Sequence, residues 1–128
     1  MKGRAILKNL KKYSRYFMGV IYILAGINHF LDPNFYVQMI PDFLPSPLLL
    51  VYVSGIVEII LGFLILFPRT QRLAAVGIIL LLIAVFPANV YMYQLGGARF
   101  DVPDVALLIR LPLQLVLIAW AALYLKKD

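Results

Sequence analysis

The chain has 128 residues, 63% of them hydrophobic and only 14% charged, and it carries a net charge of +6. Soluble domains are about 45–50% apolar and about 25% charged, so this composition is typical of a protein surrounded by lipid and excludes an ordinary water-soluble domain. Because the chain contains no cysteine, disulfides, thiolate metal sites and iron–sulfur clusters are excluded as well.

The first element is a basic leader, residues 1–15, which contains six of the twelve Lys and Arg residues. The aromatic side chains lie inside or at the edges of the apolar runs, so the leader is typical of contact with anionic lipid headgroups, and nucleic acid is not an expected partner. An apolar segment then predicts a first membrane-spanning helix at about residues 14–30. Asp32-Pro33-Asn34 ends this helix, because proline removes a backbone donor and disfavours the helical conformation of the residue before it.

Three further apolar runs have about the length that a bilayer requires, and they predict spanning helices at about residues 47–67, 73–93 and 105–125. Residues 32–46 are expected to form an external loop with one short helix at the interface. Pro47 suits a first helical position, whereas Pro87 and Pro112 predict kinks. The predicted fold class is all-α: an integral membrane four-helix bundle formed by residues 16–125, followed by a short tail at residues 126–128.

The Lys and Arg residues outside the apolar runs predict the orientation. Six lie in the leader, two in the turn at residues 68–72 and two in the tail, whereas the loop at 31–47 has none and the loop at 94–104 has only Arg99. Basic loops stay on the cytoplasmic side, and four alternating helices place all three basic segments there. The chain is therefore expected to be a multi-pass protein of the plasma (cytoplasmic) membrane with both termini inside.

Two charged residues lie within the predicted spans, Glu58 in the second and Arg110 in the fourth. Each costs about 2.5–3.5 kcal/mol near a helix centre, so both are expected to face the protein interior. From the helix rise, Glu58 is roughly 15 Å and the Arg110 backbone roughly 9 Å from the outer surface. The sequence therefore predicts a Glu58–Arg110 ion pair, with Gln114 as a further partner one helical turn from Arg110.

Three more polar residues occur at a compatible depth, Asn28 and His29 in the first span and Asn89 in the third. All four spans thus direct a polar group toward the outer half of the membrane, and the candidate ligand-binding residues are Glu58, Arg110, Asn89, His29, Asn28 and Gln114. The alternative is structural, because hydrogen bonds between membrane helices, averaging about 0.6 kcal/mol, also hold bundles together. A structural ion pair and simple helix-to-helix bonds therefore stay open beside the ligand-binding interpretation.

The first two predicted spans contain two glycines each. Gly19 and Gly26 in the first span, and Gly55 and Gly62 in the second, predict a close approach of helices.

One histidine and six acidic residues do not predict a metal site, and no catalytic residue is assigned because no nucleophile or nucleotide-binding fingerprint occurs.

The sequence resembles the DoxX-like family of small four-helix membrane proteins over about residues 13–125. The matching stretches are Gly26-Ile27-Asn28-His29-Phe30, Pro41-Asp42-Phe43-Leu44-Pro45, Ser54-Gly55-Ile56-Val57-Glu58, Phe86-Pro87-Ala88-Asn89 and Arg110-Leu111-Pro112-Leu113-Gln114. The resemblance implies a membrane four-helix fold. It also implies association with redox enzymes such as quinol oxidases and thiosulfate:quinone oxidoreductases, with oxidative-stress defence or with membrane-protein assembly. Relatives with thiol roles carry cysteines, which this chain lacks.

Two functions are left open by these observations. The first is an accessory redox-associated factor whose polar intramembrane pocket binds a quinone or another lipophilic ligand. The second is a non-enzymatic assembly factor, chaperone or accessory subunit, with another membrane protein or a second copy of the chain as its partner. A small transporter is less favoured, because no inverted repeat or pair of broken helices is evident. The sequence does not decide whether the chain is an enzyme.

Overall fold

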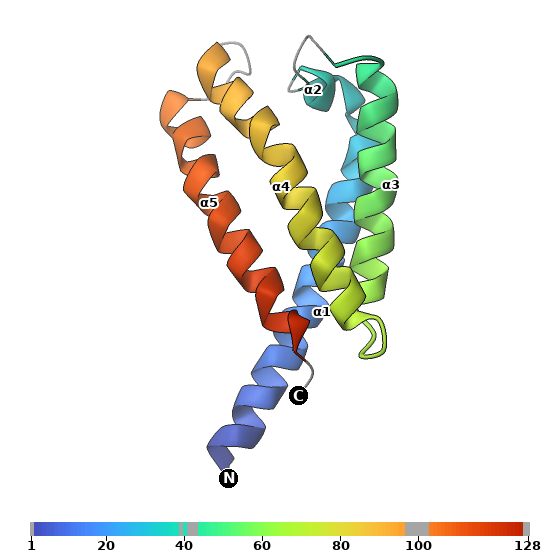
Figure 1. Ribbon diagram of the computed structural model, residues 1–128, viewed down its shortest axis with the longest axis vertical. Coiled ribbons are helices and arrows are strands. Elements are labelled where there is room, and N and C mark those ends of the chain that lie inside the picture. Colours follow the sequence, from blue (N-terminus) through green and yellow to red (C-terminus); the bar gives the residue numbers. More distant parts are fainter. Residues whose placement is uncertain (1, 39, 41–43, 97–102, 127–128) are drawn as a thin grey trace.

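The computed structural model describes residues 2–38, 40, 44–96 and 103–126, and Figure 1 shows that the regular structure in these ranges is helical throughout. Arg99 and Lys127, which the topology prediction uses, lie outside the described residues. The described ranges contain six helical elements: α1 (Lys2–Leu31), α2 (Pro33–Val37), α3 (Pro47–Ile65), α4 (Gln71–Leu95), α5 (Asp104–Ala122) and the 3₁₀ turn η2 (Leu123–Leu125). The predicted all-α class is confirmed, and the short helix expected in the 32–46 segment is α2.

Within the described ranges, three helical segments are long and apolar enough to cross a membrane: Pro47–Ile65, Gln71–Leu95 and Leu108–Leu125. The prediction included a fourth span within α1, which is absent from this set. The reason is compositional, because the first half of α1 is basic and Asn28 and His29 dilute the apolar second half. Large apolar side chains on α3 are nevertheless exposed at helical spacing, at Leu49, Val53, Ile56, Ile60 and Phe63. A row of this kind is suited to contact with lipid.

The leader and the apolar part of α1 form one continuous helix of 30 residues. At 1.5 Å per residue such a helix is about 45 Å long. Its first turns extend beyond the other helices in Figure 1. The predicted leader at residues 1–15 is therefore helical from Lys2 onward.

Helices α1 and α3 pack against each other along two pairs of glycines. A Cβ atom placed on Gly26 would lie 2.5 Å from the carbonyl oxygen of Gly55, and one on Gly62 would lie 2.7 Å from that of Gly19. No side chain fits at these separations, so the two backbones are as close as the absence of a Cβ atom permits. The predicted role of the four glycines in close helix approach is confirmed.

The second helix pair is α4 and α5, and the two pairs meet at one end of the molecule (Figure 1). This closed end contains the α3–α4 turn and η2, and it is packed around the fully buried Met18, Ile65, Ile78 and Tyr124. A buried polar side chain also stabilises this end, because Arg15 donates a hydrogen bond of 2.7 Å to the carbonyl oxygen of Ile65. From the closed end the two pairs diverge toward the other end of the molecule.

Candidate functional site

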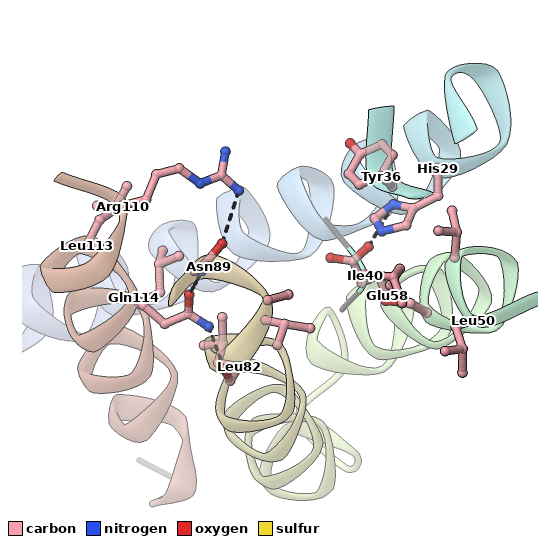
Figure 2. Close-up of a pocket in the computed structure, with 15 residues that line it drawn as sticks. His29, Tyr36, Ile40, Leu50, Glu58, Leu82, Asn89, Arg110, Leu113 and Gln114 are labelled. Atoms are coloured by element: carbon pink, nitrogen blue, oxygen red, sulfur yellow. Dashed lines mark hydrogen bonds and ion pairs between the residues drawn. The ribbon is translucent and has the colours of Figure 1, made fainter. Parts of the chain in front are cut away.

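A pocket of about 410 Å³ lies between the two helix pairs, on the side where they diverge. Its walls are largely apolar and include Val51, Leu82 and Val85. All four long helices and α2 contribute polar lining residues, shown in Figure 2: His29, Tyr36, Ser54, Glu58, Asn89, Arg110 and Gln114. A volume of this size, with apolar walls and a few convergent polar groups, is the usual composition of a small-molecule site.

One wall of the pocket is built around His29 and Glu58. The His29 Nδ1 atom lies 2.8 Å from the carbonyl oxygen of Ala25, and a carbonyl oxygen can only accept, so Nδ1 carries the proton. The same nitrogen lies 3.1 Å from Glu58 Oε2, yet this buried oxygen accepts no hydrogen bond, because the proton is directed at Ala25. Glu58 therefore presents an unsatisfied acceptor beside the pocket.

Tyr36 of α2 completes this wall. Its ring stacks on the His29 imidazole, with centroids 4.0 Å apart and ring planes inclined by 14°. Its hydroxyl accepts a hydrogen bond of 2.6 Å from the Asn28 amide. The short helix α2 thus packs against the imidazole through Tyr36, while the His29 Nδ1 atom contacts the backbone of α1.

The opposite wall is a chain of hydrogen bonds between α4 and α5. Arg110 Nη2 donates to Asn89 Oδ1 at 3.4 Å, the Asn89 amide nitrogen donates to Gln114 Oε1, and the Gln114 amide nitrogen donates to the carbonyl oxygen of Leu82. Asn89 and Gln114 each accept through the amide oxygen and donate through the amide nitrogen, so the orientation of both amides is fixed. The guanidinium at its end lines the pocket, and its hydrogen bond to Asn89 is the one it makes with the residues that the structure describes.

The predicted Glu58–Arg110 ion pair is wrong. Figure 2 shows the two side chains on opposite sides of the pocket, where Glu58 approaches His29 and Arg110 reaches Asn89. The physical reason is that depth along the helices fixes only one coordinate. Helices α3 and α5 belong to different helix pairs, and the pocket separates them.

Five of the six candidate residues line the pocket: Glu58, Arg110, Asn89, His29 and Gln114. The sixth, Asn28, is exposed outside it and acts on the site only through its hydrogen bond to Tyr36. Sequence reasoning missed Tyr36 as a lining residue, because it lies in the 32–46 segment, which has no helical periodicity to place its side chain.

The two walls offer complementary chemistry to a ligand. The His29 wall presents a carboxylate, an acceptor without a donor, and the Arg110 wall presents guanidinium N–H groups with few acceptors. Neither Asp32 nor Glu58, the two carboxylates whose side chains the structure describes, is paired with Arg110. A ligand that donates at one edge and accepts at the other would satisfy both walls at once.

A comparison with known protein families gives a match that covers the whole pocket. A family model described as a domain of unknown function, DUF8561, matches residues 18–125, a range that includes every lining residue of the pocket. No curated protein and no solved structure matches the chain. The chain belongs to the DUF8561 family.

Proposed function

We propose that the chain is an integral membrane protein that binds a lipid-soluble ligand, of the quinone kind or similar to it, in the pocket between its two helix pairs. The observation that carries the proposal is the pocket itself: apolar walls, with an unsatisfied carboxylate oxygen on one side and, on the other, an arginine that pairs with neither Asp32 nor Glu58, the carboxylates whose side chains the structure describes. Ionisable groups within apolar helices are costly and are retained mostly for function.

The proposed arrangement in the membrane is a four-helix bundle of the plasma membrane with both termini inside. Helix α1 packs along α3 through the paired glycines, so the apolar part of α1 follows α3 across the bilayer. Basic side chains gather at the closed end, at Lys8, Lys11, Lys12, Arg69 and Arg72. The positive-inside rule assigns this end to the cytoplasm. The pocket then lies in the outer half of the membrane.

Hydrogen-bonding capacity supports a ligand with two oxygen functions on a flat, apolar ring. Arg110 can donate to an oxygen at one edge, while Glu58 accepts from a hydroxyl at the other and His29 lies 3.1 Å from the same carboxylate. A quinol presents these groups, because one hydroxyl can donate to Glu58 while the oxygen of the other accepts from Arg110, and its apolar tail suits entry from lipid. This assignment agrees with the accessory redox role that the DoxX-like resemblance implies.

Binding in detergent or nanodiscs tests the proposal directly. The purified protein is titrated with a short-chain quinone and with its quinol by isothermal titration calorimetry. Saturable binding of the quinol to the wild type is expected, and each of Glu58→Gln and Arg110→Leu should weaken it about tenfold, the loss of about 1.4 kcal/mol that one charge-assisted hydrogen bond represents. Quinone binding should be weakened by Arg110→Leu alone, because the quinone has no hydroxyl to donate to Glu58. Arg69→Gln, which removes a charge at the closed end, serves as the control and should bind normally. Absent binding, or equal weakening by the control, would refute the proposal.

A second candidate, an accessory subunit of another membrane protein, is favoured by the first turns of α1. Ile6, Leu7 and Leu10 are 57%, 67% and 59% exposed on a segment that extends beyond the other helices. Deletion of residues 2–10 should then abolish co-purification of a stoichiometric partner while the remaining helices stay folded. Co-purification that survives the deletion would argue against this candidate.

A further inference from the structure

We infer that the closed end carries a second binding site, separate from the pocket, for the phosphate headgroup of an anionic lipid. The site is a groove of about 800 Å³ lined by the three cationic residues Arg69, Arg72 and Lys126 and the three apolar residues Leu73, Val76 and Leu125. It shares no lining residue with the pocket between the helix pairs. The inference rests on the membrane placement proposed above but not on the identity of the pocket ligand.

The groove is assembled by buried contacts between distant parts of the chain. Gln71, only 6% exposed, donates hydrogen bonds of 3.2 Å to the carbonyl oxygens of Tyr124 and Lys126. The Lys11 ammonium donates to the Lys126 carbonyl oxygen as well, also at 3.2 Å. These bonds hold the end of the chain against the start of α4. They place Lys126 in one groove with Arg72, to which it is remote in sequence.

The charges in the groove are not balanced by the part of the chain that the structure describes. No Asp or Glu whose side chain the structure describes lines the groove. Three cations held together repel one another, and an anion placed among them relieves this repulsion. The first turn of α4 adds to the attraction, because free backbone N–H groups and the positive end of the helix dipole favour an anion at this point.

The apolar half of the groove distinguishes a lipid from a soluble phosphate. Leu73 and Val76 are three residues apart on α4, so they lie on the same helix face, and both are exposed, at 65% and 42%. They follow Arg72 along the helix in the direction that the proposed orientation assigns to the membrane interior. A phosphodiester headgroup at the arginines can therefore extend an acyl chain along Leu73 and Val76. Inorganic phosphate has no group to fill this half.

Lipid retention tests the inference. Protein in nanodiscs of phosphatidylcholine with increasing phosphatidylglycerol is released into a native mass spectrometer, and bound lipids are counted by mass. The wild type should retain phosphatidylglycerol in preference to phosphatidylcholine. Each cation near an anionic headgroup contributes about a fivefold gain in affinity, so Arg69→Gln/Arg72→Gln should lower retention about 25-fold.

Matched variants separate a built site from general charge attraction. Arg4→Gln/Lys8→Gln removes the same number of charges from the exposed turns of α1 and should lower retention less than threefold. Arg69→Lys/Arg72→Lys keeps the charges and should retain the lipid, which excludes misfolding as the cause of the loss. Equal losses in the two glutamine variants, or no loss in either, would overturn the inference.

Two further measurements identify the ligand and keep the two sites apart. Inorganic phosphate in large excess should not displace phosphatidylglycerol, and displacement at equal concentration would assign the groove to soluble phosphate instead. The quinone titration should be unchanged in Arg69→Gln/Arg72→Gln. Loss of lipid retention with a normal titration supports the groove as a separate site. Unchanged retention with a normal titration would overturn the groove and leave the pocket proposal intact.

Discussion

Glu58 has the least satisfied surroundings of the pocket residues. Its Oε2 atom is buried, lies 3.1 Å from a ring nitrogen whose proton is directed elsewhere, and accepts no hydrogen bond. A buried acceptor left without a donor costs about 1–3 kcal/mol. Such a cost in the free protein is recovered when a ligand supplies the donor. The unsatisfied carboxylate therefore lowers the stability of the free protein but favours the binding of a ligand that supplies a donor.

This opposition predicts the behaviour of Glu58→Gln. The amide has the same shape without the charge, so the free energy of unfolding should rise by about 1–2 kcal/mol while ligand affinity falls. Thermal unfolding in detergent, followed by circular dichroism with and without ligand, measures both effects. A variant that unfolds at a lower temperature than the wild type would show that Glu58 is a structural fastening.

The hydrogen-bonded chain on the other wall predicts a second outcome. Gln114, only 3% exposed, both accepts from Asn89 and donates to the Leu82 carbonyl, so Gln114→Leu should destabilise the protein by about 1–2 kcal/mol. In a double-mutant cycle, Asn89→Ala should add less to Gln114→Leu than it costs alone, because the two residues share one bond. Unfolding in mixed micelles gives the energies. Leu115→Ala, at a 63% exposed position beside Gln114, is the control and should cost less than 1 kcal/mol.

Most of the pocket could be predicted at the residue scale, but its internal pairing could not. Charged and amide side chains are rare in apolar helices, so their rarity alone identified Glu58, Arg110 and Asn89. Their partners depend on which helices are neighbours and how each is rotated, and a single sequence carries neither quantity. Tyr36 was missed for a related reason, since its position is set by the contact of α2 with His29 rather than by any periodicity.

At the scale of elements, contacts between four glycines bring the backbones of α1 and α3 together. The two pairs, Gly19 with Gly62 and Gly26 with Gly55, have the same seven-residue spacing on helices that run in opposite directions. Each approach is backbone to backbone, which leaves nothing that can rotate away. Residue spacing and proline positions were enough to predict α3, α4 and α5 to within a few residues, because bilayer length and the chemistry of proline set their limits. The start of α1 was not predicted, because its basic first half lies outside any apolar run.

Alanine substitutions test the difference between backbone and side-chain neighbours. Gly26→Ala places a Cβ atom 2.5 Å from the Gly55 carbonyl oxygen and should destabilise the protein by about 2 kcal/mol or more. Gly77→Ala meets its nearest atom at the same 2.5 Å, but this atom is the Leu61 Cδ2 methyl, which can change rotamer. Its cost should be at least 1 kcal/mol smaller. Gly3→Ala, with nothing within 4 Å, should be neutral. Equal effects at Gly26 and Gly77 in thermal unfolding would contradict the backbone contact.

At the scale of the whole molecule, the proposed orientation can be tested without background labelling, because the chain has no cysteine. Ser46→Cys, next to the start of α3, should react with a membrane-impermeant maleimide on intact cells. Lys8→Cys and Lys126→Cys should react only after the membrane is permeabilised. Labelling of Lys8→Cys on intact cells would exclude the orientation with both termini inside.

The join between the helix pairs has a mechanical consequence. Helix α4 has 25 residues, about 37 Å, and it starts at the closed end, where the turn from α3 is short. A rotation of about 5° at this pivot moves the far end of α4 by about 3 Å, comparable to the length of a hydrogen bond. Because the backbones of α1 and α3 are in direct contact, the pair that would rotate is α4 and α5. A small change in packing around Gln71 would therefore change the width of the pocket that Arg110 and Glu58 line.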